Sequence, residues 1–113
     1  MQIVSALTSD TKQRFIISLE DGGIVRFYLY YYPSQYSWYF DFQYGDYICN
    51  GNKVVLSPNT IRHLRNRLPF GIGFLSGQQA EPFSLDDFAT GRVIMTILNS
   101  EDVKEMETLY EEV

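Results

Sequence analysis

The sequence has few of the residues that build catalytic and metal sites. It contains one cysteine, Cys49, and one histidine, His63. A single cysteine excludes an internal disulfide and a site built from several cysteines, and free cysteines are usually buried as small apolar side chains. No local motif supports Cys49 as a nucleophile with His63 as its base. We therefore expect a protein that is not an enzyme and holds neither a cofactor nor a metal ion.

Long apolar runs and clustered basic residues are also missing. No stretch approaches the roughly 20 apolar residues that cross a bilayer, and residues 1–15 lack the basic start and apolar core of a signal peptide. The net charge is -5, and the segment 101–113, with six acids and Lys104, accounts for all of it. An acidic tail on a neutral body disfavours nucleic-acid binding. We expect synthesis in the cytoplasm and no membrane, nucleic-acid or small-molecule partner.

Aromatic residues, by contrast, are abundant and concentrated. Eight of the nine tyrosines and the only tryptophan lie between positions 28 and 47. The chain has 113 residues, 45% hydrophobic and 20% charged, which is typical of one globular domain. We assign residues 1–113 to a single domain, with a β domain at 1–99 and an amphipathic helix or tail at 100–113.

Residues 13–56 alternate between apolar and polar side chains, which predicts strands. The first strand, 13–20, leads through Asp-Gly-Gly at 21–23, a hairpin signal, into a second strand at 24–32. The apolar side of that second strand is expected to face the core; its members are Val25, Phe27, Leu29 and Tyr31. The opposite side carries Arg26, Tyr28, Tyr30 and Tyr32.

A third strand at 36–44 follows a break at Pro33. Its core-facing set is predicted as Tyr36, Trp38, Phe40, Phe42 and Tyr44. A short strand at 47–49, a hairpin at Asn-Gly-Asn 50–52 and a strand at 53–56 complete five strands joined by short turns, which favours an antiparallel meander. The strongest core anchors are expected to be Phe27, Leu29, Trp38, Phe40 and Phe42.

The second half of the chain is less regular. Ser57, Pro58 and the spacing of Ile61, Leu64 and Leu68 predict a short helix over 58–67, and residues 69–83 are predicted as an irregular loop with Phe70, Ile72, Phe74 and Leu75 turned inward. The segment 92–98 is apolar on both faces, as in a central strand. Residues 100–113 predict an amphipathic helix capped by Ser100, with the apolar stripe Val103, Met106, Leu109 or Tyr110, and Val113. That helix must pack on its own sheet or on a partner.

The outward tyrosines, Tyr28, Tyr30, Tyr32 and Tyr39, have three interpretations. Cross-strand aromatic pairs contribute about 0.2–1 kcal/mol each, so the rings can simply stabilise a sheet. Tyrosine is also enriched in protein interfaces, which favours an assembly surface. A carbohydrate- or peptide-binding face is the third possibility. The basic set Arg62, His63, Arg65 and Arg67 is either a solvated helix face or a docking patch for an acidic neighbour.

The order of these features resembles a known family. The aromatic strand "VRFYLYYYPSQYSWYFDF" contains the Trp-x-x-Asp-Phe pattern of Trp38, Asp41 and Phe42, and is followed by "NGNKVVL", a Leu- and Gly-rich middle and the acidic "LDDFATGRVIMTIL". Over most of residues 13–98 this is similar to the cyanophage-type baseplate plug proteins of contractile-tailed bacteriophages. The resemblance implies a structural virion protein in the tail baseplate, near the hub and the tube, oligomeric in the assembly and held by contacts with other tail proteins.

The sequence therefore predicts an all-β protein, a small antiparallel barrel or sandwich with a short middle helix and a C-terminal helix. Its expected role is assembly, and the alternative is a small β-domain that binds carbohydrate or peptide. The residues expected to contact partners are Tyr28, Tyr30, Tyr32 and Tyr39, with Arg62, Arg65, Arg67, Val103, Met106 and Tyr110 as further candidates.

Overall fold

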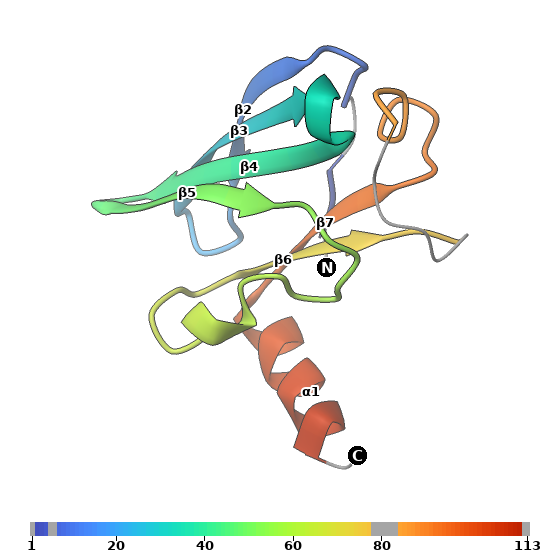
Figure 1. The fold of residues 1–113 in the computed structure, drawn as a ribbon. Coiled ribbons are helices and arrows are strands. Elements are labelled where there is room, and N and C mark those ends of the chain that lie inside the picture. The colour runs from blue at the N-terminus through green and yellow to red at the C-terminus, as the bar shows by residue number, and fades with distance from the viewer. Residues whose placement is uncertain (1, 5–6, 78–83, 112–113) are drawn as a thin grey trace.

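Two antiparallel β-sheets packed face to face make up most of the protein in the computed structural model (Figure 1). The structure describes residues 2–4, 7–77 and 84–111, without the side chains of residues 110 and 111. The larger sheet has the order β2 (Lys12–Ser18), β3 (Ile24–Tyr32), β4 (Ser37–Tyr44) and β5 (Tyr47–Lys53). The smaller sheet has the order β1 (Gln2–Ile3), β7 (Ile94–Leu98) and β6 (Gly71–Leu75). The fold is sandwich-like and all-β, and its described strands do not close into a barrel.

The predicted meander is confirmed in the larger sheet. Strand β3 pairs with β2 on one side and β4 on the other, so that Phe27 lies opposite Phe15 and Phe42. The short 3-10 turn η1 (Pro33–Gln35) connects β3 to β4, as Pro33 predicts. One core residue was predicted wrongly: Tyr36 is 69% exposed, because it closes the turn with a left-handed φ of 49° and stands outside the alternation.

The predicted hairpin at Asn-Gly-Asn 50–52 is wrong. Residues 47–53 form the single strand β5, and the register shifts between Phe40 and Phe42, so Asn50 and Gly51 together lie opposite Asp41. Gly51 has φ 73°, the left-handed value that glycine adopts in such bulges. The Asn-Gly-Asn signal therefore produces a β-bulge instead of a chain reversal, and residues 12–53 form four strands.

The predicted helix over 58–67 is wrong as well. Only the 3-10 turn η2 (Arg62–Leu64) forms there, because the preceding backbone bonds to β6: the N–H of Thr60 donates to the carbonyl of Ile72 at 2.7 Å. The expected loop at 69–83 instead contains β6, with Phe70, Ile72 and Phe74 buried as predicted and Leu75 40% exposed. Residues 78–83 lie outside the described part.

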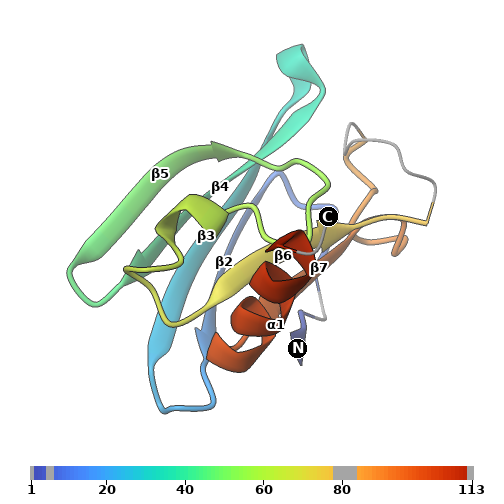
Figure 2. The same cartoon turned by 90° about the horizontal axis from the view of Figure 1, so that it is seen from below.

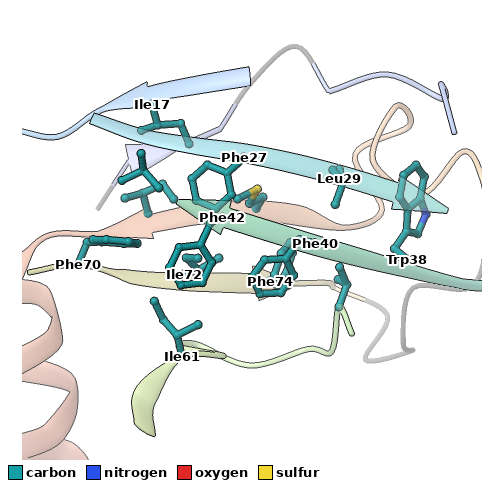
Figure 3. Packing of buried hydrophobic residues seen from close by; sticks show 14 of the residues in the cluster. Ile17, Phe27, Leu29, Trp38, Phe40, Phe42, Ile61, Phe70, Ile72 and Phe74 are labelled. Carbon is teal, nitrogen blue, oxygen red and sulfur yellow. The ribbon is translucent and has the colours of Figure 1, made fainter. Parts of the chain in front are cut away.

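The core lies between the two sheets (Figure 3). Side chains of β3 and β4 meet those of β6, with ring centroids of Phe40 and Phe74 5.5 Å apart. Trp38 is fully buried, and its ring meets that of Phe88 edge to face at 5.2 Å. The five expected core anchors are all buried. Fully burying a large apolar side chain contributes roughly 1.5–3 kcal/mol, so this cluster is the main source of stability.

The helix α1 (Ser100–Glu111) begins directly after β7, which is the central strand of the smaller sheet as predicted. Its cap is Asn99 instead of Ser100: Asn99 Oδ1 accepts from the N–H of Asp102 at 2.8 Å, and Asp102 Oδ2 accepts from the N–H of Asn99 at 3.1 Å. The helix lies on the side of the smaller sheet that faces away from the larger one (Figure 2). No helix within the described residues has the length and apolar character to cross a membrane.

Candidate protein interface

The solvent-facing side of the larger sheet, called the outer face here, carries the predicted tyrosines. Strand pairing places its residues in rows that run across the sheet, because directly paired residues share a face. Tyr30 and Tyr39 are neighbours in one row, and Tyr28 and Asp41 in the next. The residues of the outer face include Lys12, Arg14, Ile16, Ser18, Ile24, Arg26, Tyr28, Tyr30, Tyr32, Ser37, Tyr39, Asp41, Gln43, Ile48 and Lys53.

The structure brings the four tyrosines together in one cluster centred on Tyr30. The centroid of the Tyr30 ring lies 4.8 Å from that of Tyr28, 5.4 Å from that of Tyr32 and 5.9 Å from that of Tyr39. Tyr32 and Tyr39 also meet, at 5.2 Å. Each ring supports the next, so the cluster is a preorganised aromatic surface rather than a set of separate side chains.

Hydrogen bonds hold two of these rings. The Tyr30 hydroxyl donates to Asp41 Oδ1 at 2.9 Å, and the same oxygen accepts from the N–H of Gly51 at 2.7 Å, so the bulge in β5 fixes the carboxylate. Burial, assisted by the hydrogen bond to Asp41 and its negative charge, raises the pKa of Tyr30 to about 12. The Tyr39 hydroxyl donates to Gln35 Oε1 at 2.5 Å.

Apolar side chains stand beside the cluster on the same face. Ile16, Ile24 and Ile48 are each more than half exposed, and Tyr32 is 47% exposed. A shallow depression of about 470 Å³ lies between Ile16 and Ile48, next to Tyr28. Sequence reasoning missed the three isoleucines, although the alternation of β2 and the register of β5 opposite β4 were the signals that could have placed Ile16 and Ile48.

The outer face is also basic. It carries four of the nine Lys and Arg residues, Lys12, Arg14, Arg26 and Lys53, and only one of the fourteen acids, Asp41, which gives four minus one, or +3. The Arg14 guanidinium lies 4.8 Å from the centre of the Tyr28 ring, a favourable cation–π arrangement. Within the described part of the chain, none of these four bases forms an ion pair.

The other predicted contact residues lie elsewhere. Arg62 and Arg65 face α1, where Arg62 Nε lies 2.7 Å from Glu107 Oε1 and Arg65 Nε 3.4 Å from Glu107 Oε2. The pKa of Glu107 is lowered, chiefly by the hydrogen bond from Arg62. Arg67 is exposed, Val103 is buried and Met106 is half-buried. The Tyr110 side chain lies outside the described residues, so its predicted contact is not placed.

Across the residues that the structure describes, no group of three or more His, Cys, Asp or Glu side chains could hold a metal ion. Cys49 lies on β5, half-buried, with its Sγ 3.4 Å from Asn52 Oδ1.

Comparison with protein families identifies one match. The family model described as "Cyanophage baseplate Pam3 plug gp18" matches residues 1–100. The chain belongs to this family. The match to the baseplate plug family covers both sheets and the whole outer face, and it ends at the first residue of α1. It confirms the family that the aromatic strands and the Trp-x-x-Asp-Phe pattern indicated. No curated protein matches the chain.

Proposed function

We propose that this protein is a structural component of a phage tail baseplate, a plug that sits near the hub and the tube and is held by protein–protein contacts. Membership of the baseplate plug family carries the proposal. The outer face is the surface that makes the main contact, with Tyr28, Tyr30, Tyr32 and Tyr39 as its centre.

The composition of the outer face supports this role. Protein interfaces are enriched in Tyr and Arg, and their central residues are apolar and aromatic. The four packed tyrosines with the exposed Ile16 and Ile48 match that description. Because the rings are already held by one another and by Asp41, little side-chain entropy is lost when a partner covers them.

A direct test replaces single tyrosines in the phage and measures how much of the protein enters purified particles. We expect Tyr32→Ala and Tyr39→Ala to lower incorporation about tenfold or more, as for interface hot spots. Tyr36→Ala is the matched control, because Tyr36 is 69% exposed but belongs to the turn and not to the cluster. Normal incorporation of the cluster variants would contradict the assigned contact surface, and absence of the wild-type protein from particles would contradict the function.

The alternative function, carbohydrate binding, would use the depression beside Tyr28. Asp41, Gln43 and Asn50 line it and could bond hydroxyl groups. However, Tyr30 packs against three other rings, which leaves its faces covered and favours assembly over sugar stacking. A specific hit on a glycan array, lost on Gln43→Ala, would favour the alternative.

A further inference from the structure

The outer face is basic, and the exposed side of α1 carries the acids Glu101 and Glu105. The outer face has a charge of +3, while residues 101–113 have six acids and one base, or -5. The outer face lies on one side of the sandwich and α1 on the other (Figure 1). One copy therefore cannot bring its own helix onto its own outer face, but two copies can do so in head-to-tail order.

From this arrangement we infer that the outer face binds the helix α1 of a second copy of this chain. The inference deepens the proposed function and rests on it for the role of the outer face, and it names the partner as another plug subunit. The contact uses different surfaces on the two copies, so it either closes into a ring or continues as a chain of subunits.

The exposed side of α1 has the side chains that the outer face requires. Glu101, Glu105 and Thr108 follow at the spacing of one helix face and are exposed, and Lys104, also exposed, lies at one edge of this face. Leu109, beside them, is 62% exposed. Glu107 is not part of this face, because it turns inward to Arg62 and Arg65. The acidic side chains suit Arg14 and Arg26, and Leu109 suits the depression between Ile16 and Ile48.

The dimensions of the two surfaces also match. A helix of 12 residues is roughly 18 Å long at 1.5 Å per residue. Strands of 7 to 9 residues span about 23–30 Å, and four strands at about 4.8 Å spacing present a face on which such a helix fits lengthwise. Unlike charges favour the contact between the outer face and α1, and they disfavour a contact between two outer faces, in which like charges meet.

The test measures self-association of the purified full-length chain by sedimentation over a range of concentrations. We expect the mass of the wild type to rise with concentration. Arg14→Glu with Arg26→Glu should raise the dissociation constant about tenfold or more, because acids then face acids. Glu105→Lys with Thr108→Lys should do the same from the other side. Both helix positions are exposed, and Thr108 lies in the last turn of α1, where an added base suits the negative end of the helix dipole.

Combining the reversals decides between this contact and any other. The chain that carries all four substitutions should associate again, since its acidic face meets a basic helix. Arg67→Glu is the control for net charge, because Arg67 is exposed away from the outer face, and it should leave association unchanged. Circular dichroism of each variant checks that it folds.

Two results would overturn the inference. The first is self-association that neither charge-reversed variant weakens, or self-association that is weakened but does not return in the chain with all four substitutions. The other is a wild-type chain that stays monomeric at every concentration while its outer face is still required for entry into particles. That second result would assign the face to a different acidic subunit of the baseplate, and it would leave the proposed function standing.

Discussion

Arg62 and Glu107, 45 residues apart in the sequence, form a two-pronged ion pair in which Arg62 Nε and Nη2 donate to the two carboxylate oxygens at 2.7 and 2.8 Å. This pair ties η2 to the middle of α1. The residues predicted as a basic docking patch therefore serve, in part, to hold the C-terminal helix in place. Whether Arg67 and the rest of that patch also contact a partner stays a prediction.

Glu107→Gln should loosen α1 without unfolding the sheets. The substitution removes the charge that attracts Arg62 and Arg65, and part-exposed pairs of this kind have small effects on global stability. We expect faster amide hydrogen exchange in residues 100–111 and little change in the melting temperature. Glu105→Gln is the control, because Glu105 is exposed on the same helix.

The same pair predicts how α1 responds to acid. The pKa of Glu107 in the folded protein is lowered, first by the hydrogen bond from Arg62 and then by the charges of both arginines. Its contribution is therefore present above the ordinary glutamate pKa of about 4.3 and is lost as the pH falls through the lower folded value. Protection of the α1 amides, taken relative to the exchange rate of an unstructured peptide at each pH, should fall in acid, and protection that stays unchanged from neutral to strongly acidic pH would contradict this prediction.

Tyr30→Phe should alter stability at high pH. Because the folded pKa of Tyr30 is raised to about 12, its contribution is complete below the ordinary tyrosine pKa of about 10 and is lost as the pH rises through about 12. Thermal melts from about pH 9 to about pH 12 should show a shallower loss of stability for Tyr30→Phe than for the wild type. Tyr32→Phe, in the same cluster but without the Asp41 bond, is the control for the loss of a tyrosine hydroxyl.

Gly73→Ala should destabilise the smaller sheet. A Cβ on Gly73 would lie 2.5 Å from the carbonyl oxygen of Pro58 and 2.6 Å from Thr96 Oγ1, so the backbone would have to move. Overpacking of this kind typically costs about 1–3 kcal/mol, measurable by chemical denaturation. Gly77→Ala is the matched control, since its Cβ would meet nothing within 4 Å. Equal stability of the two variants would show that β6 and the 57–60 segment can separate freely.

Trp38→Ala should cost about 3–5 kcal/mol, as for other large core aromatics. The Trp38 ring is fully buried, and its Nε1 donates to the carbonyl of Ser84 at 3.0 Å. Trp38→Phe keeps most of the packing and removes this hydrogen bond, while the Ser84 carbonyl still accepts from the N–H of Asp87 at 3.2 Å, so its cost should be smaller, about 0.5–1.5 kcal/mol. Trp38 is the only tryptophan, so both variants lack tryptophan fluorescence. Their unfolding is therefore followed by circular dichroism. A Trp38→Ala protein with wild-type stability would contradict its place in the core.

The larger sheet was predictable because its signals are local. Alternation and Asp-Gly-Gly defined β2 and β3, and strand 24–32 was predicted with its observed bounds. The errors occurred where a distant contact decides the structure. Asn-Gly-Asn becomes a bulge because Asp41 on β4 accepts the Gly51 N–H. Residues 58–67 favour a helix locally, but Thr60 and the buried Asn59 bond to Ile72 instead.

The candidate interface was predictable only in part for the same reason. Period-two alternation placed Tyr28, Tyr30 and Tyr32 on one face, and pairing across Pro33 added Tyr39. The basic character of that face was not evident, because Lys12 and Lys53 lie 41 positions apart in the sequence and share a row only after four strands have paired.

The segment from Ser57 to Thr60 covers the second edge of β6. Ser57 and Phe74 exchange two backbone hydrogen bonds, at 3.0 and 2.9 Å, and Asn59 Oδ1 accepts from the N–H of Ile72 at 3.2 Å. β6, with the sequence Gly-Ile-Gly-Phe-Leu, is an apolar strand. If its edge were uncovered, strands of other chains could pair with it. An irregular stretch of four residues thus occupies the edge to which a strand of another chain would otherwise be added.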